Sequence, residues 1–493
     1  MPPTRVNSMR TKPGMLLLAG ACLAAPLGAQ QARPALTLQQ AIDLAQRNGL
    51  AAKAAVNTRD AARAREHSFN MRRLPQFSLT GNVPAYNRSI IPVVQPDGTT
   101  LFRPQQETNS NLNLTVGQQI PLTGGFLTFS SRLTQLKRSG TTSTEIWNST
   151  PFSVALNQPL LRSNSQAWDG REQGLRGDAA EQQYLEARED VALAAVEAFF
   201  DYFTARTTLR NAETNVAVND TLFRMNQGRF EVGKIGENDL GQSELQLLRS
   251  RNALDAAKLE HDRTLAALRL VLNLRPNDTL DVAVTDEVPQ FEADTMVAVQ
   301  QALRNRATIL DLRLQDVQAR RRISEARLNN GPNANVVASY GYNATAPERS
   351  LAYRDLLNAQ QFTLFVSLPL VRWGANHADN QAARADYDRV MATSVVAREQ
   401  VSQDAHFAAL LLAQSRRQLL LSAKADTVAR KRFEVAYNRY VIGRIAIDNL
   451  IVAQNDKDQA LLGYVQALRG YWNAHYRLRK LTLYDFEKGS VIR

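Results

Sequence analysis

The segment Arg229–Glu244 reads RFEVGKIGENDLGQSE, and the segment Arg439–Gln454 reads RYVIGRIAIDNLIVAQ. Both run from an arginine and an aromatic residue through a glycine to an isoleucine and then a leucine. A shift of 210 residues superimposes them, and the same shift carries Pro159 onto Pro369. A long repeat within one chain indicates a pseudo-symmetric architecture rather than two unrelated domains.

Upstream of these motifs the shift becomes 257 residues, because AIDLAQRN at Ala41–Asn48 aligns with AVQQALRN at Ala298–Asn305. The first copy therefore holds about 47 additional residues. We expect an export signal in residues 1–29, a first repeat in 30–292 and a second repeat in 293–493.

Each repeat is expected to run helix, strands, long helix, tight turn and long helix. The strands are predicted at about 76–160 and 333–370, and the tips of the helical hairpins near 229–240 and 439–450. The flanking segments are long, rich in alanine and almost free of proline, which is typical of helices packed side by side. At 1.5 Å per residue, a helix of about 50 residues would be about 75 Å long, so each repeat should form a rod.

The N-terminus has the three parts of an export signal. Basic residues precede an apolar run at Met15–Leu27, which is too short to span a bilayer, and small residues precede a cleavage point before Gln30. Cys22, the only cysteine of the chain, lies in this segment. Either it is removed with the signal, or it becomes a lipidated N-terminus.

The composition argues against several classes of function. The formal net charge is +12, but the chain has no basic run with interleaved aromatics, so we do not expect nucleic-acid binding. The five histidines show no metal-ligand spacing, and no nucleophilic motif is present, so we expect no enzyme, no cofactor and no metal site. Gly228–Lys234 fits a phosphate-loop pattern, but Ile235 stands where serine or threonine would be needed.

After the signal, no apolar stretch is long enough for a transmembrane helix. Segments of about ten residues with alternating polarity are instead typical of transmembrane β-strands. Four are predicted to cross the membrane: Asn111–Ile120, Pro151–Leu160, Asn333–Asn343 and Gln361–Leu370. Gln76–Tyr86 and Leu127–Leu136 alternate as well, which makes six candidate strands, whereas Pro92–Gly98 and Thr141–Thr150 have the composition of exposed loops.

These features resemble the TolC-type outer-membrane efflux family. The resemblance is carried by LTLQQAIDLAQRN at Leu36–Asn48, LPQFSLTGN at Leu74–Asn82, QPLL at Gln158–Leu161 and the turn motifs around Gly233 and Gly443. It implies a mainly α fold with a transmembrane β-barrel, in which long coiled helical hairpins form a periplasmic α-barrel. It also implies a homotrimer that contacts outer-membrane lipid.

The function implied by the resemblance is a passive exit duct. It would receive drugs, metals, other small molecules or polypeptide from an inner-membrane transporter of RND, ABC or MFS type through a periplasmic adaptor. The sequence names neither the cargo nor the pump class. The competing interpretations are a secreted coiled-coil scaffold and the adaptor itself.

The resemblance also assigns roles to the two tips. Residues expected to dock the adaptor are Val232, Gly233, Ile442 and Gly443. Residues expected to line a periplasmic gate are Asp239, Asp448 and Asn449. The other interpretation of the two aspartates is that they cap the starts of helices.

The chain departs from the family pattern in its strand number, because the family usually has four strands per copy and six can be counted here. The additional pair could lengthen the strands beyond the membrane, form an external lid or enlarge the barrel. We expect long hairpins whose ends lie outside the bilayer.

Overall fold

The computed structural model describes residues 35–139, 143–275, 280–284 and 288–493. The expected signal peptide and Cys22 lie outside these residues.

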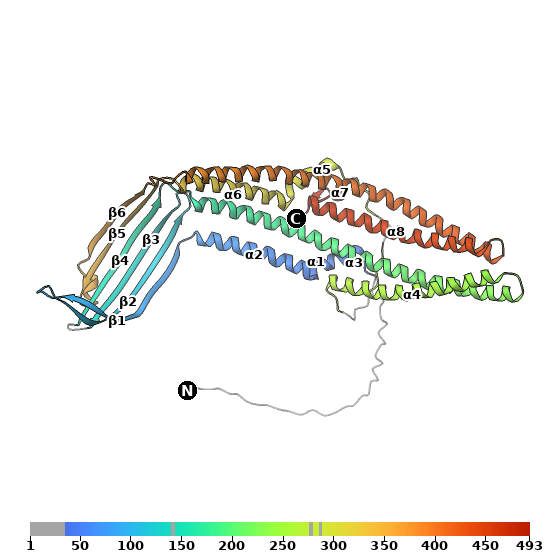
Figure 1. The fold of residues 1–493 in the computed structure, drawn as a ribbon, viewed down its shortest axis with the longest axis horizontal. Coiled ribbons are helices and arrows are strands. Elements are labelled where there is room, and N and C mark those ends of the chain that lie inside the picture. Colours follow the sequence, from blue (N-terminus) through green and yellow to red (C-terminus); the bar gives the residue numbers. More distant parts are fainter. Residues whose placement is uncertain (1–34, 140–142, 276–279, 285–287) are drawn as a thin grey trace, which may run out of the picture.

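The molecule is elongated, with a β-sheet at one end and two helical hairpins at the other (Figure 1). Helices α3 (Ser165–Glu231) and α7 (Ala375–Val441) have 67 residues each and connect the sheet to the far end. At 1.5 Å per residue each is about 100 Å long. Helices α4 (Glu237–Leu272) and α8 (Ile447–Thr482) return from the far end to the middle.

Shorter helices accompany the half of α3 and α7 that lies nearer the sheet. Helices α1 (Leu38–Asn48) and α2 (Leu50–Arg72) contact α3, and α5 (Thr295–Asn305) and α6 (Ala307–Asn329) contact α7. Helix α1 begins with a capping box, in which the Thr37 hydroxyl and the Gln40 side chain each accept a backbone N–H of the other residue. The described elements end with a short hairpin, β7 (Tyr484–Asp485) and β8 (Ser490–Val491).

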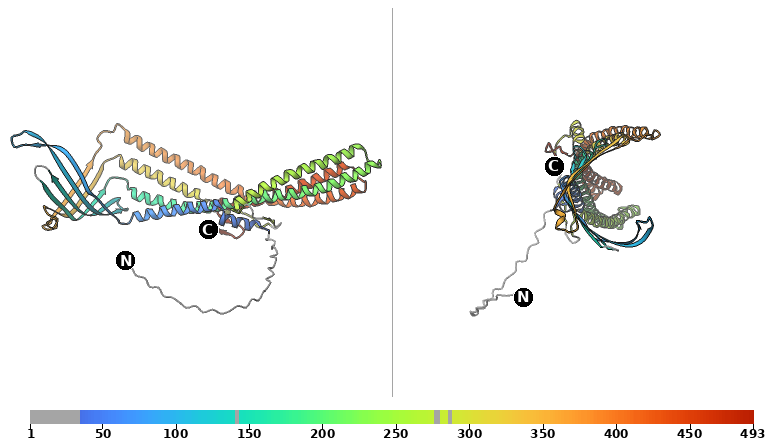
Figure 2. Two further views of the ribbon diagram at one scale, coloured as in Figure 1. Left: turned by 90° about the horizontal axis from the view of Figure 1, so that it is seen from below. Right: turned by 90° about the vertical axis from the view of Figure 1, so that its left-hand side faces the viewer.

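All six candidate strands join one antiparallel sheet, in the order of the sequence. The strands are β1 (Gln76–Val94), β2 (Thr100–Ile120), β3 (Gly125–Ser139), β4 (Thr144–Pro159), β5 (Asn333–Ala346) and β6 (Leu357–Ser367). A single 3₁₀ turn at Leu351–Tyr353 lies between β5 and β6. The sheet is curved, as the end-on view in Figure 2 shows.

Several strand boundaries differ from the sequence-based predictions, most of all the start of β2, which lies at Thr100 and not at Asn111. Strand β1 continues past Pro84, because it is an edge strand and its register with β2 shifts between Asn82 and Ala85, where proline needs no ladder bond. The predicted loops at Pro92–Gly98 and Thr141–Thr150 are accordingly shorter, since β1 reaches Val94 and β4 begins at Thr144.

Strand β6 also differs from its prediction, Gln361–Leu370. It begins four residues earlier, at Leu357, and ends at Ser367. Pro369 explains the early end, because proline lacks a backbone donor and also restricts the residue before it.

The largest hydrophobic core lies midway along the molecule, where α1, α3, α4, α5, α7 and α8 meet. Phe199 and Phe200 of α3 are fully buried there with Tyr471 of α8, and the two phenyl rings pack edge to face at 5.5 Å. Small residues such as Ala195 and Ala409 are also buried in this core and let the helix backbones approach closely. Both hairpins therefore extend from one shared, tightly packed region.

Among the residues that the structure describes, no helix is long and apolar enough to cross a membrane.

Candidate functional site

The two faces of the sheet differ in polarity. Directly paired residues of neighbouring strands share a face, and successive residues of one strand alternate between faces. One row across all six strands is Phe77, Val116, Phe129, Val154, Tyr340 and Gln360. The next row, on the opposite face, is Ser78, Thr115, Ser130, Ser153, Gly341 and Ala359.

The same contrast continues toward the helices. A further row contains Gln118, Leu127, Leu156, Ala338 and Phe362, which are apolar except for Gln118. The adjacent row on the other face contains Gly117, Thr128, Ala155, Ser339 and Gln361 and has no large apolar side chain. Phe77 and Phe362 stand at opposite edges of the sheet, with 76% and 74% of their surface exposed. In a transmembrane barrel the apolar face meets lipid and the polar face lines the lumen. The sheet has both faces.

The two hairpin tips have the same backbone structure. Gly233 and Gly443 have φ angles of +72° and +75°, a region that favours glycine. In each tip the glycine N–H donates to the carbonyl three residues before it, at 2.8 and 2.9 Å. The next N–H donates to the carbonyl five residues before it, from Lys234 to Arg229 and from Arg444 to Arg439. This pair of backbone hydrogen bonds is the Schellman motif that ends many helices, and it accounts for the glycine in both sequence motifs.

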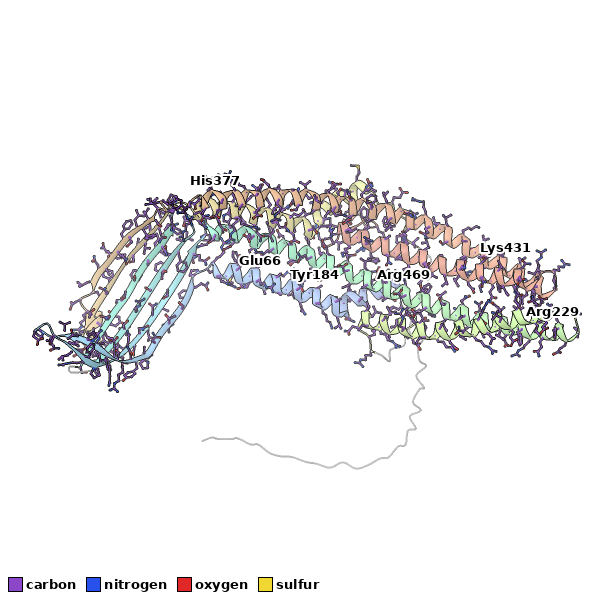
Figure 3. The ribbon with its side chains drawn as sticks, in the orientation of Figure 1. Glu66, Tyr184, Arg229, His377, Lys431 and Arg469 are labelled. Atoms are coloured by element: carbon purple, nitrogen blue, oxygen red, sulfur yellow. The ribbon has the colours of Figure 1, made fainter. Side chains whose placement is uncertain are left out.

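The tip residues lie at the end of the molecule farthest from the sheet. Arg229 marks this end in Figure 3, and His377 marks the start of α7 beside the sheet. Val232 and Ile442 are 67% and 63% exposed although both are apolar. The fold itself does not require these two side chains to be apolar, so they are available to a partner.

The gate candidates occupy the first turns of the returning helices. Asp239 belongs to the first turn of α4, and Asp448 and Asn449 to that of α8. The N-cap residues are Gly236 and Ala446, and neither provides a side-chain cap. The capping interpretation of the aspartates is therefore wrong. Their carboxylates instead lie within the positive end of a helix dipole, which favours negative charge.

The aspartates also lie between the two hairpins. The Gln242 side chain of α4 donates a hydrogen bond to the Asp448 carboxylate. Asp239 lines a hollow of about 450 Å³ together with Tyr440, Ile442 and Gly443 of the other tip. Asn449 is exposed. The structure thus places Asp239 and Asp448 where the first hairpin faces the second.

Further contacts fasten the tips to each other. Arg229 donates to the backbone carbonyl of Val441 at 2.7 Å, and its guanidinium lies 5.6 Å from the centre of the Tyr440 ring. The Tyr440 hydroxyl donates to Asn226 at 2.9 Å, in a buried position. Each such hydrogen bond contributes about 0.5–1.5 kcal/mol, so a few of them set how readily the hairpins separate.

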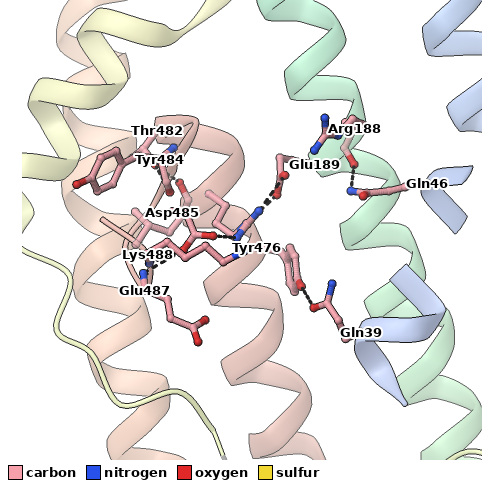
Figure 4. Close-up of polar contacts among 12 residues, drawn as sticks. Gln39, Gln46, Arg188, Glu189, Tyr476, Thr482, Tyr484, Asp485, Glu487 and Lys488 are labelled. Carbon is pink, nitrogen blue, oxygen red and sulfur yellow. Dashed lines mark hydrogen bonds and ion pairs between the residues drawn. The ribbon is translucent and has the colours of Figure 1, made fainter. Parts of the chain in front are cut away.

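A buried ionic network joins the two halves of the chain in the middle of the molecule (Figure 4). Arg479 of α8 donates to both Glu189 oxygens, at 3.1 and 3.3 Å, and to Asp485 at 2.6 Å. Asp485 also accepts the backbone N–H groups of Glu487 and Lys488, both at 3.1 Å. The sequence analysis missed this network, because its partners are far apart in the sequence. The one local signal for it was that Glu189, an acidic residue, stands just before the apolar positions that α3 buries.

His475 lies beside this network and among aromatic rings. Its ring packs against Phe291, Tyr471, Trp472 and Tyr476 at centroid distances of 5.1–6.5 Å. Burial lowers the pKa of His475 to about 4, and the Arg479 cation acts in the same direction. The imidazole is therefore neutral at physiological pH.

Within the described ranges, no group of three histidine, cysteine or acidic residues could hold a metal ion.

Comparisons with known proteins agree with this geometry. Residues 119–274 match the family model described as outer membrane efflux protein. The fold matches the CmeC outer membrane channel of Campylobacter jejuni, at 16% identity and a TM-score of 0.65, over 92% of this chain and 86% of that one. It also matches the outer membrane protein VceC of Vibrio cholerae, at 12% identity and a TM-score of 0.63, over 92% and 97% of the two chains.

A third match is the open state of the MtrE outer membrane channel of Neisseria gonorrhoeae, at 15% identity and a TM-score of 0.61, over 90% and 88% of the two chains. A search of curated proteins found no match.

The chain has the architecture of an outer-membrane channel, with a sheet at one end and long helical hairpins at the other. The match of residues 119–274 to the outer membrane efflux protein model agrees with the family that the sequence motifs resemble. Over about nine tenths of its length the chain shares the fold of these channels.

Proposed function

We propose that three copies of this chain form a passive exit duct through the outer membrane and the periplasm. Each copy consists of two structural repeats, and its sheet contributes to one shared barrel while its helices contribute to one shared tunnel. The observation that carries the proposal is the polarity of the sheet, whose apolar and polar rows lie on opposite faces across β1 to β5, with Phe362 continuing the apolar face on β6.

The duct is proposed to act in a tripartite efflux or secretion system. An inner-membrane transporter of RND, ABC or MFS type would supply the energy, and the cargo would be drugs, metals, other small molecules or polypeptide. A wide passage makes few specific contacts with its cargo, so the duct itself selects weakly.

The overall proposal is tested by fractionation and electrophysiology. The protein should partition with the outer membrane, migrate as a trimer that heating dissociates, and form channels in planar bilayers. Recovery as a periplasmic monomer without channel activity would refute the duct.

The periplasmic adaptor is proposed to dock on the two tips. Val232 and Ile442 present apolar side chains there, and the glycines beside them keep both tips in one shape. Val232→Ser with Ile442→Ser should weaken efflux and adaptor pull-down while trimer insertion stays normal, because neither side chain is buried. Met296→Ser is the matched control, since Met296 is an apolar residue away from the tips and is even more exposed, at 80%. Normal adaptor capture by the double variant would exclude this docking site.

The gate is proposed to consist of three copies of Asp239 and Asp448, with Asn449 beside them. A ring of carboxylates in a constriction favours cations over anions. Asp239→Ala with Asp448→Ala should reduce cation selectivity in planar bilayers. Losing the Gln242 contact to Asp448 should also favour the open state. Asn449→Ala is the uncharged control. A reversal potential unchanged in the double aspartate variant would exclude the acidic gate.

A further inference from the structure

We propose that the hairpin β2–β3 is part of the membrane wall, so that three copies close one barrel of eighteen strands. In this barrel, β1 of each copy pairs with β6 of the next copy. The inference rests on the proposed trimeric duct and deepens it, because it fixes how many strands each copy contributes. The occupant of both sheet edges is a second copy of this chain.

The first argument is that β2 and β3 are interior strands of the sheet and are not a hairpin packed on one of its faces. The sheet has six strands in the order β1 to β6, and β2 and β3 are hydrogen-bonded on both sides. The apolar row passes through them without interruption, since Val116 and Phe129 stand between Phe77 and Val154. A hairpin folded over the mouth as a lid would not continue a lipid-facing row.

The second argument is the position of the turn between β2 and β3. Asn164, at the start of α3, donates to the backbone carbonyl of Pro121 at 2.8 Å. Gln158, at the end of β4, donates to the carbonyl of Thr123 at 2.9 Å. The turn therefore lies at the helical end of the sheet, and β2 and β3 run its full height. With 21 and 15 residues, both exceed the 9–11 residues that a tilted strand needs to cross a membrane.

The third argument is the state of the two edges. Strands β1 and β6 each pair on one side only within the described structure. In lipid, unpaired backbone groups cost several kcal/mol each, so an open sheet edge cannot face the hydrocarbon region. Strand β1 leads away from the helices and β6 leads back to α7, so β1 and β6 of adjacent copies meet antiparallel. The apolar face also reaches both edges, at Phe77 and Phe362.

The width of the barrel follows from the strand number. At equal tilt, barrel diameter grows roughly linearly with the number of strands. Eighteen strands therefore make a barrel about 1.5 times as wide as the twelve strands that the family pattern of four per copy would give. Barrels of 16–18 strands enclose an aqueous channel. The outer-membrane section is then wide, which leaves the helical tips as the place where passage is controlled.

Cross-linking between copies tests the pairing of the edges. In a Cys22→Ser background, Leu79→Cys is combined in turn with Phe362→Cys, Leu364→Cys and Val366→Cys, which all belong to the apolar face. Within one copy, β1 and β6 are separated by five strand spacings, or about 24 Å along the sheet, far beyond the reach of a disulfide. Any link between them therefore joins two copies.

At least one of these pairs should give covalent dimers and trimers on oxidation, whereas Leu114→Cys of β2 with Leu364→Cys should give none. Linking of the β2 pair in place of the β1 pairs would overturn the proposal. So would the absence of any β1–β6 link in a trimer that inserts normally. Failure to form a trimer at all would refute the proposed duct instead, so the two outcomes are distinguishable.

A second measurement does not depend on the contact between copies. Phe129→Arg places a charge on the apolar face of β3, and Ser130→Arg places the same charge on the opposite face. If β3 crosses the membrane, Phe129→Arg should lower the yield of inserted trimer by at least about tenfold, and Ser130→Arg should insert normally. Equal yields of the two variants would show that β3 does not face lipid.

Discussion

Replacing Glu189 by glutamine tests whether the buried ionic network holds the two halves together. Glu189 is 1% exposed, and both of its oxygens accept from Arg479. Breaking a buried ion pair from one side typically costs about 3–5 kcal/mol, because the remaining charge stays desolvated. In Glu189→Gln the Arg479 guanidinium still has Asp485 as a charged partner, and the glutamine side chain still offers one oxygen as an acceptor. We therefore expect the free energy of unfolding to fall by only about 2–3 kcal/mol.

The matched control is Glu181→Gln on the same helix. Glu181 also accepts two hydrogen bonds from an arginine, Arg63, at 2.5 and 2.9 Å, but both side chains are largely exposed. Water can replace an exposed partner, so Glu181→Gln should leave stability nearly unchanged. The two glutamates differ mainly in how deeply they are buried, so the difference between the two variants measures the cost of leaving a charge without water.

The assay is guanidinium unfolding of the detergent-solubilised protein, followed by helical circular dichroism. A double-mutant cycle with Glu189→Leu and Arg479→Met completes it, because removing both partners together should cost much less than removing one. The reasoning is refuted if Glu189→Gln unfolds at the same midpoint as Glu181→Gln, or if the coupling energy in the cycle is near zero.

Three further outcomes are expected. Leu364→Arg on the apolar face of β6 should destabilise the membrane-inserted protein by about 2–4 kcal/mol and reduce the yield of inserted trimer. Thr363→Arg on the other face is the control. Gly233→Pro or Gly443→Pro should abolish efflux with the trimer still inserted, because proline can neither adopt a positive φ nor donate the N–H bond that each glycine makes; unimpaired transport would contradict this. The pKa of His475 is about 4 in the folded state, below the unfolded value of about 6.5. The contribution of the neutral imidazole to folding stability is therefore complete above pH 6.5 and is lost progressively as the pH is lowered. Between pH 7 and pH 5 the loss should be about 2 kcal/mol, and a pH dependence of thermal unfolding that His475→Phe leaves intact would contradict it.

Local patterns in the sequence predicted the parts of this fold that depend on local physics. The alternation of polarity located all six strands, and the repeated glycine motif located both tips, because a strand face and a positive φ each leave a local trace. The true length of β1 was not predictable, because Pro84 is tolerated only at a sheet edge, and edge position is a property of the whole sheet.

Contacts between distant segments left no such trace. The network of Glu189, Arg479 and Asp485 joins α3 to the end of the chain, and nothing local marks these residues as partners. The hydrogen bond from Gln242 to Asp448 could not be predicted for the same reason, since it depends on how the two hairpins pack against each other. The capping interpretation failed because the residues that end up as N-caps are Gly236 and Ala446, a difference of two or three positions.

The unbroken length of α3 has a mechanical consequence. From Phe199 in the core to Glu231 at the tip, the helix extends about 48 Å without an internal break. It is a stiff lever pivoted at the middle of the molecule, so a tilt of about 5° at the pivot moves the tip by about 4 Å. An adaptor docked on the tips as proposed would therefore open the passage by swinging rigid arms, without melting a turn of helix.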